Sequence, residues 1–265
     1  MASPTLTVSL TSVATRESLL MGAVTSMLRQ TRRPDRIKVF LSDQPFLRDT
    51  AFPNRQLPDQ LDRFFAHYHQ IVELHWIPNH GPFRKFIPAL QQSDSDEDLI
   101  VTIDDDTYYI PTLLERLEQE AINHDCITAN WCKRMKPQQH LCRLDYYEGL
   151  LGEEHPRQRS LYNFHVGKGS VCYRRRFFRK HLESFLNPDL YLKICPSADD
   201  VWFNLFRMDA GVDCIDLDRR YMLADYFEGP SGLWNNINRF NRLDNQHILN
   251  VGLLLADLNA EAGNT

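Results

Sequence analysis

The sequence predicts an α/β fold, with an open, mostly parallel central sheet and helices on both faces. In the first hundred residues, the spacing of apolar residues alternates between the period of a strand and the period of a helix. The fourth strand-like segment, residues 99–103, is apolar almost throughout, which is typical of a strand covered on both faces. Alternating strands and helices of this kind form parallel sheets, whose ligands bind beyond the carboxyl ends of the strands.

The first half of the chain is regular. Leu6, Val8 and Leu10 alternate as in a strand, whereas Leu20 and Val24 fall on one face of a helix. Strands are expected at residues 6–10, 37–41, 72–76 and 99–103, and helices at residues 20–28, 61–68 and 83–90. The fourth strand leads directly into a run of acidic residues.

The second half is less regular. Pro111 suits the first turn of a helix that continues through Ile122, and Ser197 is expected to open another helix that reaches Met208. Strands are expected at residues 127–131, 169–173 and, as the last strand, 212–217, followed by a closing helix from residue 243 onward. The chain contains no internal repeat, so a single domain of residues 1–265 is the simplest organisation.

Composition narrows the class of protein. With 265 residues, 43% of them hydrophobic, the chain can bury a sizeable core. A net charge of -5 gives no general reason to expect nucleic acid as a partner, and no segment approaches the ~20 apolar residues that span a bilayer. The six cysteines form no C-x-x-C pair, which is typical of reduced thiols. We expect a cytoplasmic protein, with at most peripheral association with the inner face of the membrane.

Three consecutive carboxylates, Asp104, Asp105 and Asp106 (the aspartate triplet), follow the fourth strand. They repel one another, and burying them is costly unless a cation neutralises their charge. Beside the crevice of an α/β sheet they would form a hard oxygen site for Mn2+ or Mg2+. The alternative is a solvated acidic turn, since aspartates favour turns.

The chain lacks the glycine-rich loops that commonly bind nucleotide phosphates. Neither G-x-G-x-x-G nor G-x-x-x-x-G-K-[ST] occurs, and the run from Gly167 to Ser170 lacks the upstream glycine. A metal ion that bridges carboxylates and phosphates is the alternative solution, and the aspartate triplet supplies ligands for it.

Several motifs, taken in order, resemble the GT-A type glycosyltransferases. They are Thr11-Ser12-Val13 with Arg16, Gly81-Pro82-Phe83-Arg84-Lys85-Phe86-Ile87-Pro88-Ala89-Leu90, Val101-Thr102-Ile103 with the triplet, Gly167-Lys168-Gly169-Ser170-Val171-Cys172-Tyr173, and Ser197-Ala198-Asp199-Asp200-Val201-Trp202. The chain looks most like bacterial members that build capsular or lipopolysaccharide sugars, over about residues 5–205.

The resemblance implies a GT-A, Rossmann-like fold and a sugar transfer from a UDP- or GDP-sugar donor to a glycan or other hydroxyl acceptor. About residues 1–110 would form the donor half, and about residues 111–265 the acceptor half and closing segment. The acidic signature of the family implies that Asp104 and Asp106 bind the metal, with Asp106 the more direct ligand. It also implies that Asp104 and Asp105 contact the donor.

Other roles follow from the same resemblance. Thr11, Ser12 and Arg16 are candidates for nucleoside contacts. Lys85 would lie near the diphosphate, where a positive charge helps the leaving group to depart, although an exposed helix lysine explains it equally well. A third metal ligand often comes from the C-terminal part of the family, and His247 is the candidate here, with His165 second. A lone histidine is usually a surface residue or one with its hydrogen bonds satisfied.

Asp199 and Asp200 resemble the acidic pair that supplies the general base of inverting members. Such a base must reach the acceptor hydroxyl, and the N-terminus of a helix would keep Asp200 ionised. The competing interpretation is a capping box formed by Ser197 and Asp200. A retaining mechanism stays open.

The stretch from Lys133 to Lys180 is basic. It suggests an anionic acceptor or anionic lipid headgroups, or else a solvated surface on which some arginines face acidic neighbours. Candidates for stacking on sugar rings are Trp202, Trp234 and Tyr173, although each is more typical of a core residue. The glycines before Tyr173 would allow a close approach of backbone to sugar, or form a plain bulge.

Two other classes of protein compete with the glycosyltransferase. A metal-dependent nucleotidyltransferase or phosphohydrolase would also use clustered aspartates, typically with two metals. A non-catalytic carbohydrate-binding protein would need neither the aspartate triplet nor the downstream acidic pair.

Overall fold

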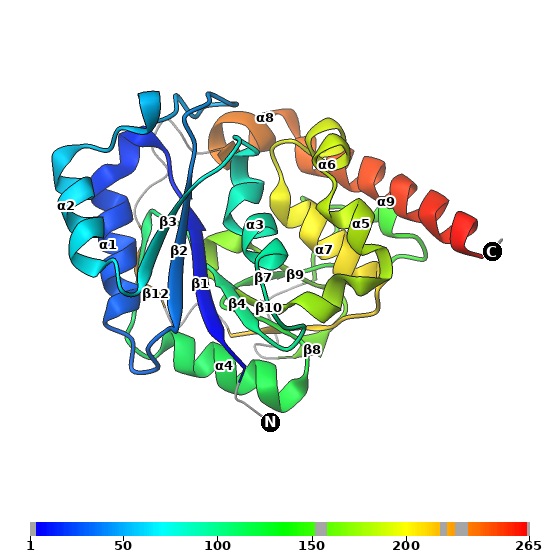
Figure 1. Ribbon diagram of the computed structural model, residues 1–265. Helices are drawn as coiled ribbons and strands as arrows, with labels where there is room; N and C mark the ends of the chain where they lie inside the picture. Colours follow the sequence, from blue (N-terminus) through cyan, green and yellow to red (C-terminus); the bar gives the residue numbers. More distant parts are fainter. Residues whose placement is uncertain (1–3, 152–157, 218–221, 226–232, 264–265) are drawn as a thin grey trace.

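The computed structural model describes residues 4–151, 158–217, 222–225 and 233–263. A twisted central sheet separates two groups of helices (Figure 1), which confirms the α/β class expected from the sequence. No helix among these residues is long and apolar enough to cross a membrane.

The first half alternates strands and helices where the apolar periodicity places them. Its elements are β1 (Leu6–Thr11), α1 (Glu17–Leu28), β2 (Arg36–Leu41), α2 (Asp59–Tyr68), β3 (Val72–Trp76), a 3₁₀ helix η3 (Gly81–Lys85), α3 (Ile87–Gln91) and β4 (Leu99–Thr102). The single helix expected over residues 83–90 is thus a 3₁₀ turn followed by a short α-helix.

The second half mixes short strands with helices. Its strands are β5 (Thr107–Tyr109), β6 (Ile127–Ala129), β7 (Cys132–Arg134), β8 (Arg159–Ser160), β9 (Asn163–His165), β10 (Val171–Arg174), β11 (Cys214–Asp216) and β12 (Met222–Asp225). Its α-helices are α4 (Leu113–His124), α5 (Leu182–Leu186), α6 (Pro188–Ile194), α7 (Asp199–Asp209), α8 (Arg239–Asn241) and α9 (Leu243–Ala262). Shorter helical turns are η4 (Leu141–Arg143), η5 (Gly167–Gly169) and η7 (Trp234–Asn238).

Within the described residues, the main sheet has eight strands in the order β3-β2-β1-β4-β10-β6-β11-β8. β3, β2, β1 and β4 are parallel, and β6 and β11 run in the same direction, whereas β10 and β8 are antiparallel to their neighbours. The chain moves outward from β1 to β3 and then returns to the other side of β1 as β4. This reversal makes the carboxyl ends of β1 and β4 the switch point at which such sheets bind ligands.

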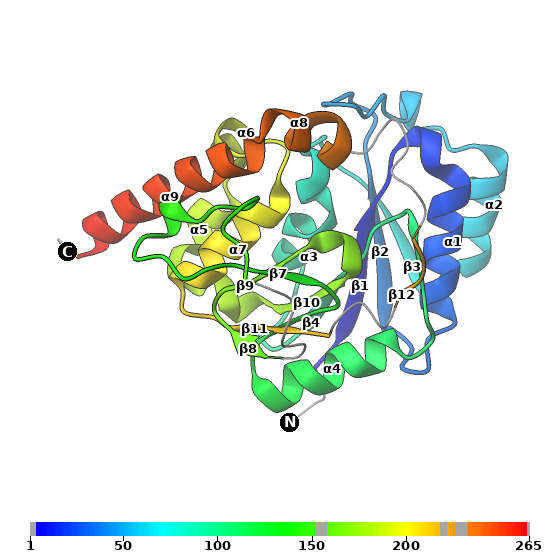
Figure 2. The same cartoon turned by 180° about the vertical axis from the view of Figure 1, so that it is seen from behind.

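Alternating side chains of β4 enter two separate cores. Leu99, Val101 and Ile103 pack with β1, α1 and α4 on one face, while Ile100 packs with α3 and α7 on the other. The unbroken apolar run of this segment is therefore explained by burial on both faces. Figure 2 shows the two groups of helices from behind, with α1 and α2 at one side of the sheet and α9 at the other.

β10 determines what faces the end of β4. Because the two strands are antiparallel, Val171 pairs with Thr102 at the carboxyl end of β4, and Arg174 pairs with Leu99 at its start. The turn η5, which leads into β10, is thereby placed beside the aspartate triplet. Arg174 is carried to the opposite end of the sheet.

Several boundaries differ from the sequence prediction because long-range contacts end the elements. α4 begins at Leu113 rather than around Pro111, whose carbonyl accepts a hydrogen bond from the Thr31 backbone N–H. Ile122 is exposed and not part of the apolar face of α4. β6 ends at Ala129, because the next backbone N–H donates to Ser170 instead of continuing a strand.

The glycine-containing strand and the last strand also differ from expectation. Gly167 and Gly169 lie in the 3₁₀ turn η5, and β10 begins only at Val171. The strand near residues 212–217 is not the last, since β12 follows it and pairs antiparallel with β5. That pairing joins segments more than a hundred residues apart, which local periodicity does not reveal.

The packing of α9 gives a stability prediction. A Cβ on Gly252 would lie 2.5 Å from the backbone N and Cα of Cys142, which cannot move aside as a side chain can. We expect Gly252→Ala to lower the free energy of unfolding by ~1–3 kcal/mol. Gly22→Ala in α1 is the matched control, because its Cβ would meet no heavy atom within 4 Å. It should raise that free energy by ~0.5–1 kcal/mol. Equal urea midpoints for the two variants would contradict this account.

Candidate active site

A cavity of about 680 Å³ opens at the switch point of the sheet. Its walls come from the loop after β1, the aspartate triplet, η3, the turn η5 and the first turn of α7. Segments beyond β7 and the start of α9 complete it on the other side. Of the ten site residues expected from the sequence, nine line this cavity, and His247 does not.

The aspartate triplet lies at the carboxyl end of an interior strand, as expected. Its three carboxylates diverge and have different partners. Asp104 accepts a hydrogen bond from Lys85 Nζ at 3.1 Å. Asp105 accepts from Ser12 Oγ at 2.5 Å and from Arg16 at 2.7 Å, and Arg16 also contacts Asp106 at 3.1 Å. The solvated turn is therefore the wrong interpretation for Asp105 and Asp106, which are both buried.

Burial and mutual repulsion control the charge of the triplet. Burial, followed by the charges of Asp104 and Asp105, raises the pKa of Asp106 to about 7, although Arg16 opposes the shift. Burial also raises the pKa of Asp105, against the opposing effects of Arg16 and Ser12. Asp106 therefore holds a proton at mildly acidic pH, and a cation nearby would displace that proton.

The donors after β1 are held by the protein itself. The Thr11 hydroxyl donates to the Phe40 carbonyl at 2.7 Å, so its hydroxyl proton is already used. Ser12 and Arg16 hold Asp105 rather than pointing into an open space. All three residues line the cavity, where their remaining groups can meet a ligand.

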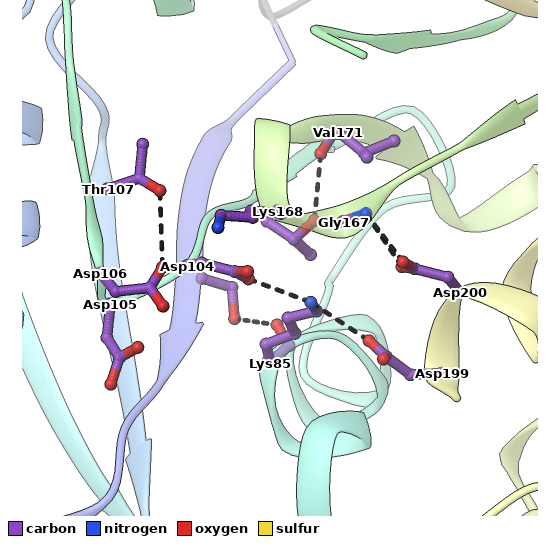
Figure 3. Close-up of polar contacts among 12 residues, drawn as sticks. Lys85, Asp104, Asp105, Asp106, Thr107, Gly167, Lys168, Val171, Asp199 and Asp200 are labelled. Carbon is purple, nitrogen blue, oxygen red and sulfur yellow. Dashed lines mark hydrogen bonds and ion pairs between the residues drawn. The ribbon is translucent and has the colours of Figure 1, made fainter. Parts of the chain in front are cut away.

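Lys85 lies between the two acidic groups of the cavity (Figure 3). Its Nζ is 3.1 Å from Asp104 Oδ1 and 3.2 Å from Asp199 Oδ2. The residue is 8% exposed, so the exposed helix lysine is the wrong alternative. Burial alone would lower the pKa of Lys85, but Asp104, Asp199 and Asp200 outweigh burial and raise it well above its usual value. Lys85 is therefore a permanent ammonium that links the two acidic groups.

Asp200 is positioned by the backbone of η5. Both of its carboxylate oxygens accept from the Gly167 N–H, at 3.0 and 3.1 Å. A Cβ on Gly167 would lie 2.6 Å from Asp200 Oδ1 and 2.7 Å from Lys85 Nζ, so a larger residue here would displace the ends of these two side chains. Gly167 thus allows a close approach of the backbone, as expected, but the groups that approach it are the side chains of Asp200 and Lys85.

The capping box is the wrong interpretation of Ser197 and Asp200. α7 begins at Asp199, its N-cap is Ala198, and no side chain caps it. The Ser197 hydroxyl instead contacts Asn238 Oδ1 at 2.6 Å and His247 Nε2 at 3.2 Å. Asp200 faces the cavity without a capping role.

The helix N-terminus also does not keep Asp200 ionised. Burial, and then the adjacent charge of Asp199, raises the pKa of Asp200 to about 8 despite the opposing effects of Lys85 and Gly167. Burial also raises the pKa of Asp199, although its direct ion pair with Lys85 opposes the shift. A carboxylate whose pKa lies near the working pH is well suited to accept a proton during a reaction.

His247 lies on α9, next to the cavity wall. Its two ring nitrogens contact Ser197 Oγ and the Ile194 carbonyl, both at 3.2 Å. No three His, Cys, Asp or Glu side chains in the described parts of the chain are arranged to hold a metal ion together. His165 is fully buried, and its Nδ1 lies 3.5 Å from the Tyr173 hydroxyl.

Sequence reasoning missed several residues of the cavity. Arg84 and Asp49 form a buried ion pair at 2.7 Å in its wall, although Asp49 comes from an irregular segment without a motif. Lys168 lines the cavity near Asp106 and counteracts the rise of its pKa. The second half adds Trp131, Lys133, Tyr146, Asn238 and Asp244. The basic composition of the stretch that begins at Lys133 indicated a binding role for this part of the chain. The spacing of its residues did not indicate which of them line the cavity.

Other candidates lie elsewhere. Trp202 and Tyr173 are fully buried core residues, as the structural interpretation of them expected, whereas the side chain of Trp234 lies outside the described part of the structure. Arg174 and Arg176 form ion pairs with Glu97 and Asp125, and Arg175 pairs with Asp96. These arginines therefore face acidic neighbours at the end of the sheet opposite the cavity.

Solved structures with similar folds were found at low sequence identity. S. aureus TarS 1–349 in complex with UDP-GlcNAc has a TM-score of 0.54 and 13% identity, over 86% of this chain and 60% of that chain. Its complex with UDP has a TM-score of 0.52 and 14% identity, over 83% and 60% of the two chains. Neither a protein-family model nor a curated protein sequence matches.

The chain has the GT-A fold. It spans about 60% of the TarS fragment and 36% of a longer TarS structure. A synthetase of CMP:2-keto-3-deoxy-manno-octonic acid in complex with CTP also aligns, at a TM-score of 0.49 and 10% identity. That likeness is too slight to carry an argument about activity.

The raised pKa of Asp200 gives a prediction for stability. Its folded pKa of about 8 exceeds the ordinary value of 3.8, so the folded protein binds this proton more tightly than the unfolded chain. The resulting stabilisation is complete below pH ~4 and is lost as the pH rises to about 8. Asp200→Asn, which has no charge to bury, should therefore gain in melting temperature relative to wild type as the pH rises from 5 to 9.

Melting curves of both proteins across that pH range test this. Asp257→Asn, a change on the exposed face of α9, should show a nearly constant difference from wild type. If the difference in melting temperature between Asp200→Asn and wild type did not vary with pH, ionisation of Asp200 would not destabilise the folded protein, and the prediction would be wrong.

Proposed function

We propose that the chain is a divalent-metal-dependent glycosyltransferase that moves a sugar from a nucleotide-diphosphate sugar to a hydroxyl acceptor. One observation carries the proposal. The aspartate triplet and Asp200 face the same cavity from its two sides, at the switch point of a GT-A sheet. The TarS structures of this fold hold UDP and UDP-GlcNAc, which makes a UDP-sugar the first donor to test, ahead of a GDP-sugar.

The residues of the triplet suit a Mn2+ or Mg2+ ion that is bound together with the donor. Asp104 and Asp106 offer hard carboxylate oxygens, and the raised pKa of Asp106 reflects an excess of buried negative charge. Two carboxylates do not make a complete site, but Mg2+ commonly takes one or two carboxylates and fills its shell with phosphate oxygens and water. His247 remains a proposed third ligand, and it would have to leave Ser197 to serve.

The chemistry divides between the two sides of the cavity. A bound cation would supply positive charge to the departing diphosphate. Lys85 and Lys168 add fixed positive charge on the same side. The acceptor oxygen forms a bond to the anomeric carbon while the bond from that carbon to the diphosphate oxygen breaks. Asp200 takes the proton of the acceptor hydroxyl, and a single displacement of this kind inverts the anomeric centre.

The arrangement favours this function over its competitors. A two-metal nucleotidyltransferase or phosphohydrolase needs carboxylates that converge on both metals. Here Asp105 is turned away toward Ser12 and Arg16, and Asp199 pairs with Lys85. A non-catalytic sugar-binding protein would have no use for two buried acidic groups. A retaining mechanism would assign Asp200 another role.

The two halves of the chain would divide the substrates. We assign the donor to about residues 1–110 and the acceptor to about residues 111–265, within a single domain through which the sheet continues.

We place the protein in the cytoplasm, free or against the inner face of the membrane. Its six cysteines are all free thiols, although the sulfurs of Cys132 and Cys214 lie 3.7 Å apart, and free thiols are typical of a reducing compartment.

The first experiment is a thermal-shift screen of UDP- and GDP-sugars with and without Mn2+. A ligand raises apparent stability by mass action, so the true donor should raise the melting temperature only when Mn2+ is present. Equal shifts in EDTA and in Mn2+ would contradict the role of the metal.

Asp106→Asn should weaken the binding of UDP in Mn2+ sharply, by at least ~tenfold, because it removes a charge with little change of shape. Since the pKa of Asp106 is about 7, the proton competes with the cation, and wild-type affinity should fall as the pH drops from 8 to 6. Titration calorimetry at both pH values measures this. The proposal for Asp106 fails if the affinity is flat with pH or if the variant keeps the pH dependence of wild type.

Asp200→Asn should lower turnover by ~10²–10⁴-fold, the usual contribution of a positioned base. UDP affinity in Mn2+ should stay within twofold of wild type, because Asp200 lies across the cavity from the triplet. Initial rates of nucleoside diphosphate release and calorimetry provide the two measurements. Near-normal turnover would transfer the role of base to Asp199 or indicate a retaining mechanism.

A further inference from the structure

The second half of the chain supplies the cavity with another set of side chains, which the proposed mechanism does not use: Trp131, Lys133 and Asp244. Lys133 lies in β7, and Trp131 directly precedes that strand. Asp244 lies in the first turn of α9. All three residues line the cavity together with Asp200, the proposed base. A substrate hydroxyl that reaches Asp200 must therefore bring the remainder of its molecule next to them.

This set is built into the fold. Lys133 Nζ lies 3.4 Å from the centroid of the Tyr146 ring, a cation–π contact, and 5.9 Å from that of Tyr147. The Tyr147 hydroxyl donates to Asp244 Oδ2 at 2.5 Å. The Tyr146 backbone N–H donates to Asn245 Oδ1 at 2.8 Å, which fastens the tyrosine segment to α9. Asp244 itself is only 3% exposed.

The charges here suit hydroxyl groups and oppose an anion. Burial lowers the pKa of Lys133 to about 8, with Asp244 and Asp200 opposing that shift. The ammonium of Lys133 thus faces two acidic groups, Asp244 and Asp200, whose pKa values are raised chiefly by burial. A phosphate or carboxylate on the ligand would add a third acidic group. A neutral hydroxyl can instead accept from Lys133 and donate to Asp244, so both partners are satisfied at once.

The remaining basic residues do not offset this balance. Lys168, the other lysine of the second half that lines the cavity, lies toward Asp106 on the donor side (Figure 3). Arg174 is placed at the opposite end of the sheet by its pairing with Leu99, and it is engaged by Glu97 and Asp125. Among the described residues of the second half, Lys133 and Lys168 are therefore the basic side chains that line the cavity.

We propose that Lys133 and Asp244 form an acceptor subsite for a neutral sugar, whose hydroxyls they share and whose apolar ring face contacts Trp131. The inference rests on the proposed glycosyltransferase function and names its acceptor class. In this subsite Lys133 and Asp244 determine the specificity for the acceptor, while Asp200 takes the proton of the acceptor hydroxyl.

The first test uses the full chain, Mn2+ and the nucleotide sugar identified by thermal shift. The acceptors are the methyl glycosides of glucose, galactose, mannose and N-acetylglucosamine, compared with methyl glucuronide and methyl glucoside 6-phosphate. Release of nucleoside diphosphate above the rate without acceptor is measured, with mass spectrometry of the product. At least one neutral glycoside should stimulate release more than its charged counterparts.

Stimulation by the charged glycosides alone, or by none of the neutral ones, overturns the subsite while leaving Mn2+-dependent donor binding intact. Failure of the proposed function gives a different result, since no nucleotide sugar would then bind in a Mn2+-dependent way. The two failures are thus distinguished by calorimetry with the donor.

The second test uses Asp244→Asn and Lys133→Met separately. Asparagine can still accept from Tyr147, and methionine can still pack on Tyr146, so each variant removes a charge and retains the packing. Each should raise the KM for the neutral acceptor by ~tenfold or more, the size expected for one charge-assisted hydrogen bond. The Kd of UDP in Mn2+ should change less than twofold.

Arg175→Gln is the matched control, because it removes a positive charge of the same basic stretch at the far end of the sheet. It should leave the acceptor KM unchanged. An unchanged KM in either folded variant of Lys133 or Asp244, or an equal rise in the Arg175 control, overturns the inference.

Discussion

The ion pairs of Lys85 are the constraint on which the cavity depends. This ammonium is buried, and it is stable there only because Asp104 and Asp199 contact it from two sides. The Lys85 backbone is itself fixed, since its carbonyl accepts from the Ser9 hydroxyl of β1 at 2.5 Å. Gly167 leaves the space that the Lys85 side chain needs. One side chain thereby joins β4, β1 and α7 and sets the distance between the proposed metal site and the proposed base.

Local patterns predicted the layered part of the molecule because burial repeats along single elements. Alternation in β1 and the double burial of β4 are properties of a few consecutive residues, and each is visible without knowing a neighbour. Pairings between distant segments leave no such trace. β12 joins β5, and Asn130 turns to Ser170 and so ends β6, through contacts that no short window contains. The same limit explains why α4 starts after Pro111.

The site divides in a similar way. Position at a strand end was enough to predict the aspartate triplet, because topology alone takes the carboxyl ends of parallel strands to the ligand crevice. The partners of each carboxylate were not predictable. Ser197 and Asp200 have the spacing of a capping box, yet Ser197 turns to Asn238 and His247, and Asp200 turns to Gly167. Each of these contacts crosses between elements, so spacing along one helix could not distinguish them.

Buried acidic groups connect the stability of the protein to its proposed activity. The pKa of Asp106 is raised to about 7 and that of Asp200 to about 8, chiefly by burial, so keeping both ionised at neutral pH opposes folding. A cation with a diphosphate would relieve this at Asp106 by replacing a proton with a stronger positive charge. At Asp200 the charge of Asp199 adds to the effect of burial, while Lys85 and the Gly167 N–H oppose the rise of its pKa without cancelling it. Its raised affinity for a proton favours removal of the proton of an acceptor hydroxyl by the ionised form of Asp200, the role that we propose for it.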